Sequence, residues 1–185
     1  FYIPKGMLLK THLSRLMRSF MAAFAMWDPL PAVYRDALRN VYRNRGWDLT
    51  TGKGGDPGTT YPTMAEFYDA IVDSAERLTA GYGAEAKGNV RQGSEIRIRD
   101  LVQNTGMIIN VEGATPVAEI LARPTVMELG RVGSSEDIAL VMGFLLTALT
   151  EELESAQKDV PQSQRTRLHA TLIEEAHRLM SRGQY

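Results

Sequence analysis

The sequence contains no cysteine, which excludes a disulfide framework and any metal site built on thiolates. No apolar run approaches the ~20 residues that a helix needs to cross a bilayer, so we expect no membrane segment. The lack of cysteine suits a reducing compartment, and we therefore expect a cytoplasmic protein. The first residues, Phe1–Pro4, include no Met and no signal-peptide layout, so we also expect a piece of a longer protein.

Neither sign of charge dominates the chain. Its 21 lysines and arginines nearly balance its 22 aspartates and glutamates, which gives a formal net charge of -1. A chain without overall positive charge can bind nucleic acid only through a local patch or through parts outside this sequence. Its 185 residues, 44% of them hydrophobic, are enough for one domain with a core.

A phosphate-binding loop of the Gly-x-x-x-x-Gly-Lys-[Ser/Thr] type is also missing from the sequence. The glycine-rich stretch 52–58 has the wrong spacing, because Lys53 precedes the glycine pair. Pro57 would in addition remove a backbone donor that a phosphate cradle uses. We interpret this stretch as a surface loop.

The first half of the chain has apolar residues at spacings of three and four, which predicts helices. One stripe runs from Leu13 to Trp27 and a second from Val33 to Tyr42, with prolines between them. We expect an antiparallel helix pair over residues 11–45. Its predicted buried residues are Phe20, Phe24 and Leu38, and its predicted exposed residues are Arg35, Arg39 and Arg43.

Two further helices are expected in this half. Thr63 and Glu66 match a capping box, which predicts that a helix begins there and ends near Gly81. A polar segment around 89–103, with Ile98 and Leu101, is expected to form the next helix. Residues 1–105 would thus be a helical subdomain.

The character of the sequence changes near residue 106. Short apolar runs at 107–111, 125–129 and 169–173 have the length of buried strands. Ser134 or Ser135 is a candidate N-cap for a helix between the last two runs. Strand, helix and strand in this order predict an α/β unit with a parallel sheet over residues 106–185.

The chemically most informative feature is a pair of acids, Glu174 and Glu175, at the end of the third run. Side chains at the carboxyl end of a buried strand lie where α/β proteins bind ligands. The pair could equally be the first-turn acids of a helix. Glu174 and His177 also have the Glu-x-x-His spacing of di-iron bundles, but such sites need a second pair that this sequence does not offer.

The segment Leu172–Leu179, with Ala-His-Arg after the two acids, resembles the Walker B segment of HerA/FtsK-type ATPases. Residues 124–129, the helix from Glu136 and the opening 1–6 are similar to other parts of that family. The resemblance implies a partial RecA-like parallel sheet core that carries a large N-terminal helical insertion. The family's phosphate loop would precede Phe1, so the isolated chain is not expected to hydrolyse ATP.

The resemblance also implies roles for individual residues. Glu174 would be the acid on the Mg²⁺ side and Glu175 the catalytic base that acts on water attacking ATP. Many P-loop ATPases have Asp at the first position, which leaves the metal role of Glu174 less well supported than the base role of Glu175. Arg97 lies where relatives often have an arginine that reaches a neighbouring subunit's nucleotide, although it could also be a solvated helix residue.

A protein of this family would be a ring-forming homo-oligomer, expected to be a hexamer, that couples ATP hydrolysis to DNA translocation or helicase action. DNA is expected as partner from the resemblance alone. One alternative is an ATPase of conjugation or type IV secretion. A different class is a non-catalytic helical interaction module, in which residues 11–80 bind a partner.

Overall fold

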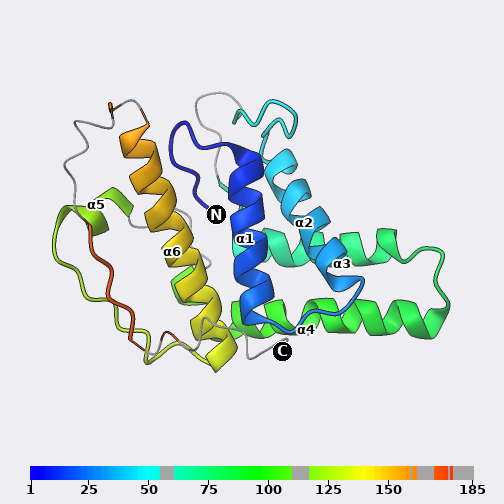
Figure 1. Cartoon of the computed structure of the whole chain (residues 1–185). Coiled ribbons are helices and arrows are strands. Elements are labelled where there is room, and N and C mark those ends of the chain that lie inside the picture. Colours follow the sequence, from blue (N-terminus) through cyan, green and yellow to red (C-terminus); the bar gives the residue numbers. More distant parts are fainter. Residues whose placement is uncertain (55–60, 110–116, 159, 162–168, 175, 177–185) are drawn as a thin grey trace, which may run out of the picture.

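The computed structural model describes residues 1–185 except 55–60, 110–116, 159, 162–168, 175 and 177–185. Six α-helices and no strand occur in the described part (Figure 1). The helices are α1 (Leu9–Ala23), α2 (Leu30–Asn44), α3 (Met64–Leu78), α4 (Ala84–Ile109), α5 (Val117–Ala122) and α6 (Ser135–Gln157). None of the described helices is long and apolar enough to cross a membrane.

The helix pair expected over residues 11–45 is confirmed. The chain runs along α1 and returns along α2, so the two helices are antiparallel neighbours (Figure 1). Phe20, Phe24 and Leu38 are at most 4% exposed, whereas the three arginines of α2 lie on its exposed side. The four-residue spacing of buried positions places them on one side of each helix, which buries that side against the rest of the bundle.

The expected capping box of Thr63 and Glu66 is present, and the expected N-cap Ser134 forms a second box with Asp137. At the start of α3, the Glu66 amide donates to Thr63 Oγ1 at 3.3 Å and the Thr63 amide donates to Glu66 Oε2 at 2.7 Å. At the start of α6, Ser134 and Asp137 make the equivalent pair. Each box satisfies backbone donors that a helix end would otherwise leave unpaired, so it fixes where the helix begins.

The helices pack in sequence order around an aromatic core. α2 packs on α3, α3 packs on α4, and α6 packs along the free side of α1. Phe20 lies at the centre, with its ring centroid 5.0 Å from that of Phe67 on α3 and 5.2 Å from that of Phe144 on α6. Helices from both halves of the chain therefore share one core.

The sheet expected in residues 106–185 is wrong for the part of the chain that the structure describes. Residues 107–109 continue helix α4, and the rest of that run lies outside the described residues. Residues 125–129 and 169–173 have no regular secondary structure. The helix that contains Ile98 and Leu101 continues to Ile109, and a short apolar run alone does not distinguish a strand from a helix segment.

The two C-terminal runs also lack the burial that a parallel strand requires. Val126 is 88% exposed and Leu172 is 92% exposed. Strands of parallel sheets are covered on both faces and paired along at least one edge, so an isolated apolar run has nothing to stabilise it as a strand. The expected α/β fold and RecA-like core are therefore replaced by a helical bundle in the described residues.

The contact between α6 and α1 includes a close approach at Gly143. A Cβ atom at this position would lie 2.9 Å from Cβ of Ser19, closer than real Cβ atoms come. On α4, a Cβ atom at Gly88 would meet nothing within 4 Å. Both glycines lie inside helices, so they form a matched pair in which only one position is sterically restricted.

We predict that Gly143→Ala destabilises the protein by roughly 1–2 kcal/mol, because the gain in helix propensity is smaller than the cost of overpacking. Gly88→Ala should instead stabilise it by about 0.5–1 kcal/mol. Urea unfolding followed by circular dichroism measures both. An equal stabilisation by the two substitutions would show that α6 does not approach α1 closely at Gly143.

Candidate functional site

Glu174, the first acid of the predicted pair, lies at a turn that follows the irregular segment 169–173. It is exposed, and its carboxylate makes no hydrogen bond or ion pair within the described part of the chain. In the same segment the His169 Nε2 atom lies 2.8 Å from Thr171 Oγ1. Glu175 and His177 lie outside the described residues. The structure thus leaves Glu174 open to a ligand but does not bring it into a cluster.

Arg97, the third predicted site residue, lies on α4 and is half-buried. Its guanidinium donates weakly to the carbonyl of Gly93, at 3.4 Å. Burial raises the pKa of Tyr34 on α2, and the positive charge of Arg97 opposes that shift. Arg97 therefore lies near the core-facing phenol of Tyr34. Within the described residues no contact joins it to Glu174.

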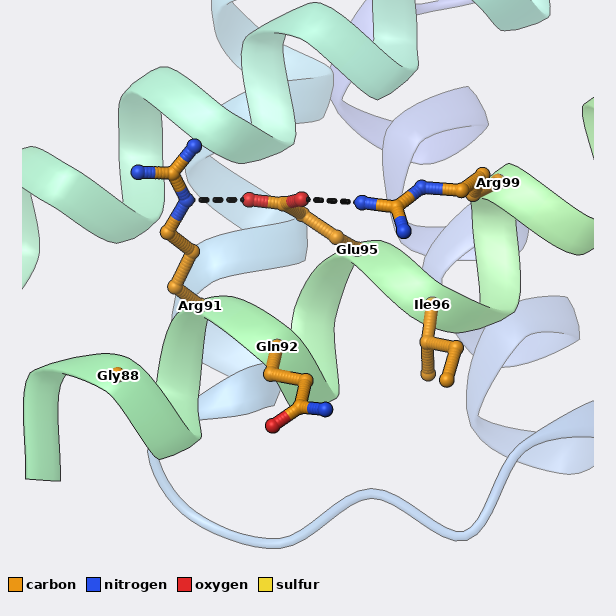
Figure 2. Close-up of a pocket in the computed structure, with 6 residues that line it drawn as sticks. All are labelled: Gly88, Arg91, Gln92, Glu95, Ile96 and Arg99. Atoms are coloured by element: carbon orange, nitrogen blue, oxygen red, sulfur yellow. Dashed lines mark hydrogen bonds and ion pairs between the residues drawn. The ribbon is translucent and has the colours of Figure 1, made fainter. Parts of the chain in front are cut away.

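A shallow cavity of about 170 Å³ lies along a different side of α4 (Figure 2). Its lining consists of Gly88, Arg91, Gln92, Glu95, Ile96 and Arg99. Glu95 lies between two arginines, 2.6 Å from Nε of Arg91 and 2.7 Å from an Nη atom of Arg99 (Figure 2). Because Glu95 is bound on both sides, it is not available as a general base, and we assign no chemistry to this cavity.

A second polar cluster joins α2 to α3. The Asp36 carboxylate accepts hydrogen bonds from Ser74 at 2.7 Å and from Asn40 at 3.0 Å, and it pairs with Arg77. Burial raises the pKa of Asp36, but the hydrogen bonds from Arg77 and Ser74 outweigh burial and lower it overall. Each partner holds the carboxylate in its charged form, so this cluster fixes the packing of two helices.

Among the described residues, the most deeply buried titratable side chains form a network that the sequence did not predict. His12 on α1 and Glu151 on α6 are 2% and 0% exposed, with 2.7 Å between Nδ1 and Oε2. The other ring nitrogen of His12 lies 2.7 Å from the Tyr42 hydroxyl. That hydroxyl donates to the carbonyl of Phe1 at 2.6 Å. The network therefore links α1, α2, α6 and the N-terminal segment.

The second oxygen of Glu151 is only partly compensated. Oε1 is buried without a hydrogen-bond partner in the described structure, and the nearest positive charge, Nη1 of Arg15, is 3.5 Å away. Arg15 gives its better hydrogen bonds to Glu154, at 2.7 and 2.8 Å. Burial lowers the pKa of His12, and its hydrogen bond to Glu151 opposes that shift. The network has no access to solvent, so we assign it to helix packing and not to catalysis.

The sequence contained a signal for one half of this network. His12 lies four residues before Leu16 and eight before Phe20, within the buried stripe of α1. A polar residue in such a stripe needs a buried partner. Nothing in the sequence identified Glu151 as that partner, because the two are 139 positions apart.

Comparisons with protein-family models, curated proteins and solved structures find no match for this chain. The described residues also contain no group of three or more His, Cys, Asp or Glu side chains that could hold a metal ion. Any function must therefore be argued from the motif and the geometry of this chain.

We predict that Glu151→Ala lowers the free energy of unfolding by about 3–5 kcal/mol, because it leaves His12 and Arg15 without their buried carboxylate. The matched change Glu154→Ala, one turn away on α6, should cost no more than about 1 kcal/mol, since its pair with Arg15 is half-exposed. Thermal and urea unfolding measure both. Similar small losses for the two variants would contradict the buried network.

Proposed function

We propose that this chain belongs to an ATP-driven motor of the HerA/FtsK type and contributes the acids that act on ATP. The observation that carries the proposal is the segment Leu172–Leu179, in which two acids are followed by Ala-His-Arg. An open carboxylate at Glu174 is compatible with it. The proposal concerns the acid pair and includes no sheet in the described residues.

Glu174 fits a role on the metal side of such a site. Mg²⁺ is a hard cation that keeps most of its waters and is held by one or two carboxylates together with substrate phosphates. An exposed carboxylate without a protein partner can accept hydrogen bonds from those waters. When bound, the cation would supply charge neutralisation for the phosphates, and Glu174 would hold and orient its water shell.

Glu175 would act as the general base. A carboxylate in this role accepts a proton from the water that attacks the γ-phosphate, while the bond to the leaving ADP oxygen breaks. The phosphates need backbone donors from a Gly-x-x-x-x-Gly-Lys loop, which this sequence lacks. The loop must therefore come from another segment or another chain. Homo-oligomeric assembly and DNA as the moved polymer remain parts of this proposal.

A second candidate is a helical interaction module without catalysis. It is favoured by the bundle of α1, α2, α3, α4 and α6, whose core closes without the described residues 169–174. The two candidates differ in what the acid pair does. A motor needs the pair for turnover, whereas a module keeps its function when both acids are neutralised.

We predict that Glu175→Gln, in an assembly that supplies the phosphate loop, keeps ATP binding but lowers hydrolysis by roughly 10²–10⁴-fold. Gln has nearly the same shape as Glu but cannot accept the proton. Glu174→Gln should weaken Mg²⁺-dependent ATP binding as well. Glu128→Gln neutralises an exposed acid outside the predicted pair and is the charge-matched control. It should leave ATP binding and hydrolysis unchanged.

Binding is measured with a fluorescent ATP analogue and turnover by phosphate release. Arg97→Ala should lower turnover without changing nucleotide affinity if this arginine acts on a neighbouring subunit's site. Mixing the Arg97→Ala and Glu175→Gln subunits should then restore part of the hydrolysis. Full activity of Glu175→Gln with unchanged affinity would contradict the motor and leave the interaction module.

A further inference from the structure

Arginines form a regular row along the outer side of α2. Arg35, Arg39 and Arg43 are all exposed and follow one another at intervals of four residues. At a rise of about 1.5 Å per residue, this places them about 6 Å apart along the helix axis. The only acid of α2, Asp36, is already bound by Arg77 and Ser74 of α3.

The neighbouring helix α1 extends this positive surface. Lys10 and Arg18 are exposed, and α1 contains no acidic residue. His12, Arg15 and Ser19 of α1 contact α6, and Leu16 and Phe20 face the core. Lys10 and Arg18 are thus left exposed on α1, and α1 neighbours the antiparallel α2 (Figure 1). We name these five cations (Lys10, Arg18, Arg35, Arg39 and Arg43) the basic face.

The basic face differs from the rest of the bundle in how its charges are paired. Within the described residues, none of its five cations has an acidic partner, and Arg43 donates only to the amide oxygen of Asn40. Most cations elsewhere in the bundle do pair with acids, namely Arg15, Arg45, Arg77, Lys87, Arg91 and Arg99. A chain with a net charge of -1 therefore places five cations that have no acidic partner among the described residues on two adjacent helices.

The side chains of α2 indicate which class of partner the basic face binds. The apolar residues of α2 are buried, with Val33, Tyr34, Leu38 and Val41 at most 3% exposed. A membrane-surface helix needs an exposed apolar side to insert between lipids, and α2 has none. Protein interfaces depend on aromatic or aliphatic anchors, which the exposed side of α2 also lacks. Evenly spaced guanidinium groups on a helix whose own large apolar side chains are buried suit the phosphates of a nucleic acid.

We propose that the basic face binds the phosphate backbone of a duplex nucleic acid. The bonds would run from guanidinium and ammonium groups to phosphate oxygens, which position a duplex without reading its sequence. The surface is limited on one side by the groove between α2 and α3, where Asp69 and Asp73 would repel phosphates. The inference rests on the proposed motor only for its biological setting, because it names the surface through which such a motor would hold its polymer.

The test is the binding of the chain to a short fluorescein-labelled DNA duplex, followed by fluorescence anisotropy without ATP or Mg²⁺. The triple variant Arg35→Gln, Arg39→Gln and Arg43→Gln should bind at least about tenfold more weakly. The slope of log K against log salt should become shallower by up to about 2.7, because each phosphate that the protein neutralises adds about 0.9 to it. Circular dichroism checks that the variant is folded.

Two controls separate the basic face from net charge and from packing. The first control is a triple Gln variant at exposed cations outside the face, Lys53, Arg123 and Arg131. It removes the same charge and should change the affinity for the duplex less than about twofold. Arg→Lys at all three α2 positions keeps the charge and should retain most of the binding. The binding assay uses no nucleotide, so a negative result does not bear on the ATPase proposal. A negative result of the Glu175→Gln test likewise does not bear on duplex binding.

Equally weakened binding in the two Gln triples would overturn the inference, since binding would then follow net charge alone. Absence of duplex binding by the unmodified chain at low salt would overturn it as well. Binding to phosphatidylserine vesicles that exceeds binding to the duplex and is abolished in the α2 triple would assign the face to membranes instead.

Discussion

The packing of α6 against α1 depends on one buried hydrogen-bonded pair, His12 with Glu151. A carboxylate and an imidazole removed from water are costly unless each has a partner. Tyr42 bonds the other ring nitrogen of His12, and Arg15 lies 3.5 Å from the second oxygen of Glu151, so these contacts favour one register of α6 along α1. The small residues Gly143 and Ser19, two turns away, allow the helices to approach in that same register. The pair thus connects the last described helix to the first.

Local signals in the sequence were sufficient to predict the helices of the first half. The stripes of α1 and α2, the proline break between them and the Thr63–Glu66 capping box all act within a few residues, so they can be recognised without tertiary structure. The exposure of Arg35, Arg39 and Arg43 followed from the same periodicity. The pairing of these helices with α6 could not be predicted, because it depends on contacts between residues more than a hundred positions apart.

The prediction of strands from short apolar runs was wrong for the described residues. Such runs do not distinguish strand from helix, and a strand also requires neighbours that periodicity cannot supply. Residues 107–109 extend α4, while Val126 and Leu172 remain exposed in irregular segments. Of the candidate site, the sequence predicted only the acid pair Glu174 and Glu175, through a motif, and the roles of these acids stay predictions. The predicted placement of these acids beside Arg97 or a nucleotide would require an assembly, and neither the motif nor the helical bundle determines one.

α6 closes a helical bundle from which residues 169–174 are excluded. Hydrogen exchange of the backbone amides, read residue by residue by NMR, tests it most directly. We predict strong protection across residues 140–151 of α6, where the helix is buried against α1, and rapid exchange across 125–129 and 169–174. Rapid exchange in α6 together with protected amides at alternate positions of 169–173 would contradict the account, because that pattern is typical of a strand paired at one edge.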